Sequence, residues 1–404
     1  MARRSEEPAP LERPGASDIR WRSEAGPSAG GVVARLLEVG ALCLLLGCGG
    51  SGGGAAAASG APSGNPSQIA AAGYGICALL GGEVLCWGNG SALAAVAGLG
   101  SDIASIAVGY EQACALAGGG VLCWGWDDYG QLGNGSTAEA YSAAAVPVSG
   151  LASGVGAIAS GGDHSCAIVS GAVQCWGYNG YGQLGNGSTD SSPVPVAVQG
   201  LPSGVTAIAA GKEHTCAIAS GAALCWGDNA NGELGSPPAG TSAVPVAVQG
   251  LSGAVTALAA GGLHTCVLAG GSVQCFGDNA FGELGNGDAA SSFFPVQVRG
   301  LAGTVTSIAA GGYHTCALVE GGVECWGRND HGELGDGTTS DSSVPVPVSG
   351  LGGGVTAIAA GDFHTCALTA GGALCWGDGA LGELGGGSAA GSSVPVPVSH
   401  LSAP

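Results

Sequence analysis

Cysteine is the residue type whose spacing in this 404-residue chain points most directly to chemistry. Sixteen cysteines occur, and fourteen of them form pairs whose members lie nine residues apart. Such pairs can form disulfide bonds, stay as buried apolar thiols, or bind zinc, although the spacing lacks the CxxC element of zinc sites. The pairs are Cys77–Cys86, Cys114–Cys123, Cys166–Cys175, Cys216–Cys225, Cys266–Cys275, Cys316–Cys325 and Cys366–Cys375.

The residues between the paired cysteines favour the disulfide. The midpoint of every pair falls on a step into glycine, such as Glu320-Gly321. Glycine at the second position of a two-residue hairpin turn adopts positive φ without strain. Counting outward from that turn places the two cysteines opposite each other at a non-hydrogen-bonded position, where Cα atoms are closest. We therefore predict one disulfide across each hairpin, worth roughly 2–3 kcal/mol, with buried free thiols as the alternative.

The other residues that could bind a ligand or catalyse a reaction recur at fixed positions of the repeat. The Gly-rich GELGDG segment lacks the GK[ST] ending of a phosphate-binding loop, and the aspartates at 228, 278 and 378 lack calcium-loop spacing. No Ser–His–Asp or Cys–His arrangement stands out, so the sequence predicts no catalytic residue, no metal and no cofactor. Five histidines recur once per repeat, which favours a local hydrogen bond within each repeat over a shared metal ion: His164, His214, His264, His314 and His364.

Positions that vary between repeats lie in loops and are candidates for binding. One variable set contains Tyr129, Tyr181, Asn231, Phe281, His331 and Leu381, and another contains Tyr110, Asp163, Lys212, Leu263, Tyr313 and Phe363. Exposed loop aromatics are frequent contacts in interfaces. Packing between neighbouring repeats is the alternative. The candidate binding residues are Trp126, Tyr129, Tyr181, Phe281, His331, Tyr313 and Phe363.

The elements that must position these residues recur with a fixed period. From Cys175 onward, the second cysteine of each pair recurs every 50 residues, and the first repeat lacks about fifteen residues between Gly90 and Leu99. Seven units fill residues 68–404, with approximate bounds 68–100, 101–150, 151–200, 201–250, 251–300, 301–350 and 351–404.

Each unit reads as four short strands. In the sixth unit these are VTSIAA, HTCAL, GVECWG and VPVPV, with a long Gly-rich loop before the last. Pro345 and Pro347 remove two N–H groups from one side of the last strand, which places it at a sheet edge. Repeated four-stranded units of this size predict an all-β fold, a seven-bladed β-propeller of four-stranded antiparallel blades.

The N-terminal region has the features of an export signal. Residues 1–31 form a polar leader, whose presence suggests that the true start lies near Val32 or Val33. Residues 32–48 contain an apolar run that is too short to span a bilayer as a helix but fits a signal-peptide core. The run ends in Leu45-Leu46-Gly47-Cys48, which resembles the lipobox of bacterial lipoproteins and implies lipid attachment at Cys48. The alternative is a disordered tail before a buried apolar segment. Residues 49–67 are a Gly/Ala/Ser-rich tether.

The negative charge of the chain argues against nucleic acid as a partner. Only three basic residues follow position 40, namely Lys212, Arg299 and Arg328, against 23 acidic residues. A surface with about twenty net negative charges repels phosphate backbones and anionic lipids. We therefore expect no nucleic-acid partner and no membrane contact except through the lipid.

Residues 161–188, which include GGDHSCAI and VQCWGYNGYGQLGNGS, carry a family resemblance. The pattern resembles regulator of chromosome condensation repeats over nearly all of residues 68–404. The resemblance implies a seven-bladed propeller whose loops bind other proteins. The family resemblance also suggests guanine-nucleotide exchange as an activity. That activity needs an inserted loop, and units 3–7 contain no extra segment that could form one. Departures are Gly75 and Gln112 at the histidine position, Phe276 at the tryptophan position, and the missing loop of unit 1.

Together these features predict an exported, lipid-anchored propeller of bacterial type that binds a protein or a glycan and is not an enzyme. The expected location is the cell envelope or the outside of the cell, because paired cysteines are typical of oxidising compartments. Two other classes stay open. One is a propeller enzyme, a hydrolase or lyase acting on envelope polymers, and the other is an exchange factor.

Overall fold

The computed structural model describes residues 66–138, 140–238 and 240–402, all within a compact unit that spans Gly60–Pro404. The predicted leader, the signal segment with Cys48 and nearly all of the tether lie outside the described residues. The described part of the chain contains no helix with the length and apolar character needed to cross a bilayer.

Within these residues, twenty-eight strands form seven four-stranded antiparallel sheets, each built from four consecutive strands. The first four blades comprise β1 (Gln68–Ala72), β2 (Gly75–Leu80), β3 (Glu83–Gly88), β4 (Ser91–Ala95), β5 (Ile103–Val108), β6 (Gln112–Ala117), β7 (Gly120–Trp126), β8 (Tyr141–Pro147), β9 (Val155–Ser160), β10 (His164–Val169), β11 (Ala172–Gly177), β12 (Ser192–Ala197), β13 (Val205–Ala210), β14 (His214–Ala219), β15 (Ala222–Asp228) and β16 (Thr241–Ala247). The last three comprise β17 (Val255–Ala260), β18 (His264–Ala269), β19 (Ser272–Gly277), β20 (Ser292–Gln297), β21 (Val305–Ala310), β22 (His314–Val319), β23 (Gly322–Gly327), β24 (Ser342–Pro347), β25 (Val355–Ala360), β26 (His364–Thr369), β27 (Gly372–Gly377) and β28 (Ser392–Ser402).

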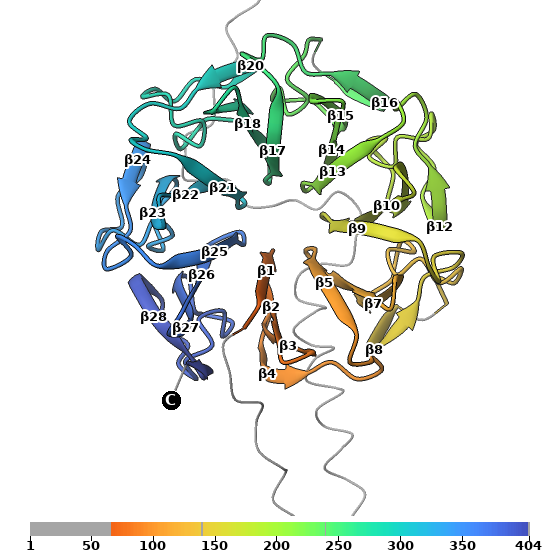
Figure 1. Ribbon diagram of the computed structural model, residues 1–404, viewed down its shortest axis with the longest axis horizontal. Coiled ribbons are helices and arrows are strands. Elements are labelled where there is room, and N and C mark those ends of the chain that lie inside the picture. Colours follow the sequence, from red (N-terminus) through yellow and green to blue (C-terminus); the bar gives the residue numbers. More distant parts are fainter. Residues whose placement is uncertain (1–65, 139, 239, 403–404) are drawn as a thin grey trace, which may run out of the picture. The chain divides into compact units, whose positions relative to one another are not determined.

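The blades stand in a ring around a central axis, which confirms the predicted seven-bladed propeller (Figure 1). The first strand of each blade lies nearest the axis and the fourth lies at the rim. The strand that carries Pro345 and Pro347 is β24, which pairs only with β23, so its predicted edge position is confirmed. Proline is tolerated there because one side of the strand has no ladder to complete.

The cysteine pairs are disulfides in all seven blades, as the hairpin geometry predicts. Cys316 faces Cys325 across β22 and β23, and their Cα atoms are 4.1 Å apart. In this hairpin the turn residues Glu320 and Gly321 have φ of 52° and 84°, the positive values that a tight hairpin turn requires. The seven bonds indicate an oxidising compartment.

The glycine that follows each buried aromatic has a steric role. In blade 5 the register of β19 against β20 shifts between Cys275 and Gly277, which is a bulge. Gly277 has φ of +111°, and a Cβ atom there would lie 2.6 Å from the carbonyl oxygen of Leu263. Only glycine fits, and this explains the recurring Cys-Trp-Gly or Cys-Phe-Gly sequence.

Hydrophobic cores lie between neighbouring blades. One cluster, for example, joins Cys266 and Leu284 of blade 5 to Ala317 and Trp326 of blade 6. The ring closes where β1 meets β25, and none of the described strands is exchanged between blades 1 and 7. Closure instead uses backbone hydrogen bonds, from Asp362 N to Gly73 O at 2.9 Å and from Gly90 N to Leu381 O at 2.8 Å.

The recurring histidines connect blades. His314 Nε2 lies 2.8 Å from Thr365 Oγ1 in the next blade, and burial lowers the pKa of His314 to about 3, so the ring is neutral. The expectation of a hydrogen bond within each blade is therefore wrong, because this side chain leaves its own sheet toward the neighbouring one. The same 2.8 Å contact joins His164 to Thr215, His214 to Thr265 and His264 to Thr315.

His314→Ala is expected to lower the free energy of unfolding by about 1 kcal/mol more than His364→Ala. Both changes remove a fully buried imidazole, but Nε2 of His364 has no hydrogen-bond partner among the described residues. Ile76 occupies the corresponding position of the next blade, where a threonine would stand. Urea unfolding of the two variants measures the difference. Equal losses would show that the interblade bond contributes no net stability.

Candidate binding face

The predicted binding residues lie at one end of the ring. In an antiparallel blade, the turn between the first two strands and the loop between the last two emerge at the same end. The disulfide hairpin turns emerge at the opposite end. We call the first end the loop face. It carries Trp126, Tyr129, Tyr181, Phe281, His331, Tyr313 and Phe363.

The structure divides one of the variable sets found in the sequence into two rings. Tyr110 and Lys212 precede the histidine position by two residues and line the central cavity, whereas Asp163 and Leu263 precede it by one and lie outside the cavity lining. The outer ring, directly before the second strand of each blade, is Tyr74, Glu111, Asp163, Glu213, Leu263, Tyr313 and Phe363.

Aromatic side chains of blades 5, 6, 7 and 1 form a continuous arc around Arg328. The guanidinium carbon lies 5.1 Å from the ring centroids of Phe281 and Phe363 and 5.5 Å from that of Tyr313. Such contacts are attractive because a cation faces the negative side of the ring. The Tyr313 and Phe363 centroids are 6.0 Å apart, and Tyr74 continues the arc at 5.9 Å from Phe363. We call Phe281, Tyr313, Arg328, Phe363 and Tyr74 the aromatic arc.

A second aromatic group lies on blades 2 and 3. The ring centroids of Tyr129 and Tyr178 are 4.8 Å apart, and those of Tyr178 and Tyr181 are 6.3 Å apart. Tyr129 is 44% exposed, so packing between blades leaves much of its ring open to solvent. The rings of this group therefore pack against one another between blades while that of Tyr129 stays accessible to solvent, and their role in binding stays a prediction.

Carboxylates occupy the outer ring between blades 2 and 4. Burial, followed by the charge of Glu111, raises the pKa of Asp163 to about 7. Burial also raises the pKa of Glu111 and of Glu213. We call Glu111, Asp163 and Glu213 the acidic arc. Its members repel one another when ionised, and the nearby charge of Lys212 offsets this only in part, because the pKa of Asp163 and of Glu213 stays raised beside it. A further cation placed among them would therefore be stabilised.

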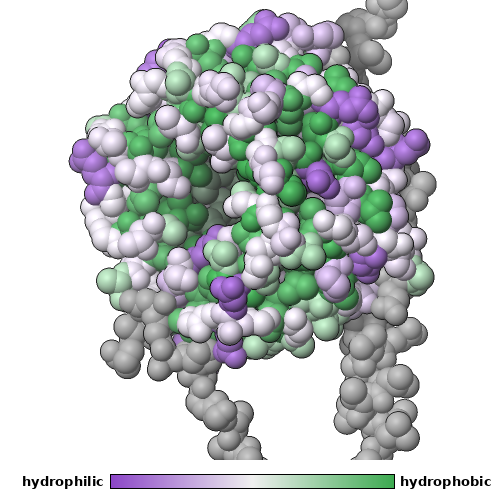
Figure 2. Space-filling view, turned by 45° about the vertical axis from the view of Figure 1, so that its right-hand side comes forward, coloured by the Kyte–Doolittle hydropathy of each residue, from purple (hydrophilic) through white to green (hydrophobic). Residues whose placement is uncertain are grey.

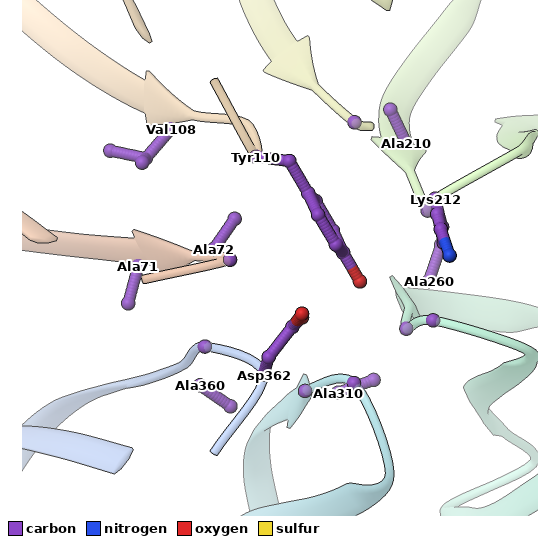
Figure 3. Close-up of a pocket in the computed structure, with 18 of the residues that line it drawn as sticks. Ala71, Ala72, Val108, Tyr110, Ala210, Lys212, Ala260, Ala310, Ala360 and Asp362 are labelled. Carbon is purple, nitrogen blue, oxygen red and sulfur yellow. The ribbon is translucent and has the colours of Figure 1, made fainter. Parts of the chain in front are cut away.

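The axis of the ring contains a small cavity of about 80 Å³. Figure 2 shows the ring hollowed at its centre, with apolar residues along much of the border. Alanine and glycine form most of the wall, and Tyr110 extends across it toward Asp362, with which it forms a hydrogen bond (Figure 3). Burial raises the pKa of Asp362 to about 6. Ligand sites usually measure roughly 300–1,000 Å³, so this cavity is too small for a polymer substrate.

The fold and the repeated motifs can now be compared with known proteins. The profile of the RCC1-like domain family matches residues 91–403, which is most of the chain. The chain belongs to the RCC1-like domain family. The resemblance found in the repeats is thus confirmed.

Solved structures agree on the fold of this RCC1-like domain. Human WBSCR16 shares 23% identity, covers 76% of this chain and 84% of its own, and has a TM-score of 0.67. Prp20p from Saccharomyces cerevisiae shares 19%, covers 74% and 81%, and has a TM-score of 0.63. Yeast RCC1 (Prp20) bound to Kap60 shares 21%, covers 86% and 91%, and has a TM-score of 0.70. At these identities the likeness concerns the fold.

Sequence reasoning missed several residues of the loop face of this RCC1-like domain. Tyr178 and Arg328 each follow a Trp-Gly dipeptide, and Tyr74 occupies the outer-ring position of the first blade. Comparing every unit at the position after Trp-Gly would have found the first two. Arg328 could not have been assigned its partners from sequence, because Phe281 and Phe363 belong to the blades on either side of its own.

One group on the loop face has metal-ligand types. Asp330, His331 and Glu333 are the only His, Cys, Asp or Glu group in the described ranges whose ligand atoms all lie within 4.8 Å of one another. Asp330 already accepts hydrogen bonds from the Arg328 guanidinium, and His331 Nδ1 lies 2.9 Å from its carboxylate. A fixed positive charge therefore already neutralises the acid that a metal cation would need.

Proposed function

We propose that this RCC1-like domain is a protein-binding module whose loop face takes a partner segment rich in lysine or arginine. The observation that carries the proposal is the acidic arc on the same face as the aromatic arc and the tyrosines. Ionised carboxylates attract cationic side chains, and the rings of Tyr129 and Tyr178 on blades 2 and 3 can hold them by cation–π contact, whereas the aromatic arc already faces the guanidinium of Arg328. Prp20p, a structural neighbour, is described by its binding to Gsp1p and histones, which supports a protein partner.

The proposal also covers the location of the protein in the cell. We propose export through residues 32–48 and lipid attachment at Cys48, as the sequence suggests, so that the propeller works in the cell envelope. The seven disulfides support an oxidising location. Several acyl chains would anchor the protein firmly, whereas one would hold it only weakly. Fractionation of cells that express the wild type and Cys48→Ser tests this part: the wild type is expected with membranes and the variant in the soluble fraction.

Binding is tested with the mature protein and two peptides of equal length, one Lys-rich and one Glu-rich. The Lys-rich peptide is expected to bind, and added salt is expected to weaken it. The Asp163→Asn/Glu213→Gln double variant is expected to bind roughly tenfold more weakly. Glu83→Gln is the matched control, since Glu83 is an exposed carboxylate at the opposite end of the ring.

Other outcomes would assign the protein to another class. Equal binding of both peptides, or of a neutral envelope glycan in place of the Lys-rich peptide, would contradict recognition by the acidic arc. Turnover of an envelope polymer would favour the enzyme alternative. Accelerated nucleotide release from a small GTPase would favour the exchange factor.

A further inference from the structure

A repeated contact joins the long loop of one blade to the tryptophan of the next. Trp176 Nε1 donates to the carbonyl oxygen of Gln131 at 2.9 Å. Leu132, the next residue of the loop, is 1% exposed and belongs to the same hydrophobic cluster as Trp176. A Cβ atom on Gly133 would lie 2.7 Å from the Trp176 Nε1 atom, so glycine is required after the leucine. The loop thus inserts a Gly-Gln-Leu-Gly turn into the interface.

The same contact recurs around the ring, with glutamine or glutamate before the leucine. The tryptophan N–H donates to a loop carbonyl oxygen in four further pairs: Trp226 to Gln183 at 2.8 Å, Trp326 to Glu283 at 2.7 Å, Trp376 to Glu333 at 2.7 Å, and Trp87 to Glu383 at 2.8 Å. In blade 5, Phe276 takes the tryptophan position without an N–H group and packs against Gly235.

The interface between blades 1 and 2 lacks this turn. In blade 1, only Asn89 and Gly90 separate β3 from β4, so no Gly-[Gln/Glu]-Leu-Gly segment exists. Trp124 of blade 2 occupies the receiving position, yet its Nε1 has no hydrogen-bond partner among the described residues, and the side chain is 8% exposed. Trp176 is 0% exposed by comparison. The cluster of this interface contains Trp124 and the partly buried Leu99 from the segment between β4 and β5, but no leucine of a Gly-[Gln/Glu]-Leu-Gly turn.

A cavity of about 230 Å³ lies at the interface that lacks the turn. Ala92 and Ala95 of β4 in blade 1 and Trp124 of blade 2 are among the residues that line it. Trp126 and Tyr141 border it with ring centroids 5.3 Å apart, and Tyr141 is 54% exposed. A single buried water needs only about 10–15 Å³, so the cavity between blades 1 and 2 is large enough to hold side-chain and backbone atoms.

We propose that the cavity between blades 1 and 2 binds a Gly-[Gln/Glu]-Leu-Gly turn of a partner protein. The carbonyl before the leucine accepts the N–H of Trp124, and the leucine enters the apolar interface, as at the other interfaces of the ring. The occupant is deduced from those interfaces, where the same receiving surface is filled by this turn. The described loops of the chain already occupy their own neighbours, so the turn comes from a second protein.

Calorimetry of the mature protein with a peptide of the protein's own loop sequence, NDHGELGDG, tests the proposal. The peptide is expected to bind with one-to-one stoichiometry. Trp124→Phe, which removes only the N–H group as Phe276 does naturally, is expected to weaken binding roughly tenfold. Trp326→Phe is the matched control, because its N–H is already occupied by Glu283; peptide affinity should not change.

The peptide itself supplies two further controls. Replacing its leucine by alanine removes the apolar anchor, and replacing the following glycine by alanine introduces the atom that the interfaces exclude. Both peptides are expected to bind at least tenfold more weakly. Equal affinity of the leucine-to-alanine peptide, or absence of binding at millimolar peptide, would overturn the proposal. Dimers that form in sedimentation and disappear in Trp124→Phe would assign the cavity to a second copy and also overturn it.

Discussion

Reduction of all seven disulfides is expected to unfold the propeller at room temperature. Each bond closes a loop of about ten residues, which corresponds to roughly 2–3 kcal/mol in the chain-entropy treatment. Even when the contributions are far from additive, losing seven of them approaches the 5–15 kcal/mol that stabilises a typical domain. Circular dichroism with and without reductant in a urea series measures the change. A reduced protein with an unchanged urea midpoint would show that the bonds are not stabilising.

Thiol counting checks the premise of that experiment. Under non-reducing denaturation, the fourteen cysteines of the propeller are expected to show no reactive thiols, because all are paired. Fourteen reactive thiols would instead support the buried-thiol alternative. The double variant Cys316→Ala/Cys325→Ala is expected to lose about 2–3 kcal/mol, and it leaves no unpaired thiol to complicate refolding.

The order of reduction in the native protein should follow exposure. Cys316 and Cys325 are 0% exposed, so reductant reaches them only when the blade opens. Cys86 of blade 1 is partly exposed and lines the cavity between blades 1 and 2. We therefore expect Cys77–Cys86 to be reduced first under native conditions, which mass spectrometry of alkylated peptides would show. Simultaneous reduction of all seven pairs would indicate that the ring opens only as a whole.

The sequence predicted the parts of this fold that depend on local geometry. The 50-residue period gave the number of blades, and the glycine at each hairpin turn gave the register that brings Cys316 opposite Cys325. Pro345 and Pro347 gave the edge strand because a missing N–H is a property of one residue. Each of these features is contained within one repeat.

Features between blades were harder to predict, for a physical reason. His314 bonds to Thr365, 51 positions away, because ring closure brings equivalent faces of neighbouring blades together. A periodic sequence offers the same partner types inside the blade and one period later, so spacing alone does not choose between them. The loop aromatics posed the same problem. The missing loop of unit 1 was visible as a length difference, but its consequence for Trp124 needed the interblade contact.

Glu283→Gln is expected to stabilise the protein at pH 8 and to leave its stability nearly unchanged at pH 4. Glu283 is 1% exposed, one carboxylate oxygen accepts the N–H of Phe281 at 2.9 Å, and the other has no hydrogen-bond partner among the described residues. Burial, with a smaller contribution from the charge of Asp278, raises the pKa of Glu283 to about 7. The native state therefore keeps a proton that the unfolded chain releases near pH 4.5.

The sign of the effect follows from that difference in proton binding. Between about pH 4.5 and 7 the native state binds more protons at this site, so the contribution of Glu283 to stability falls as pH rises through this window. The full loss above pH 7 is at most about 3 kcal/mol, from 1.36 kcal/mol per pKa unit. Glutamine has the shape of the protonated acid and does not ionise. The free energy of unfolding of the variant therefore does not fall at this site as the pH rises.

Blade 3 provides the reverse experiment. Gln183 occupies the equivalent position, is 0% exposed, and accepts the N–H of Tyr181 at 3.0 Å through its amide oxygen. Gln183→Glu is expected to match the wild type at pH 4 and to lose about 1–3 kcal/mol at pH 8. Urea unfolding of both variants and the wild type at the two pH values measures the cycle. If Glu283→Gln gives the same change in stability at pH 4 and pH 8, the buried carboxyl does not hold a proton in the native state, and its burial must be compensated by a positive group or by water.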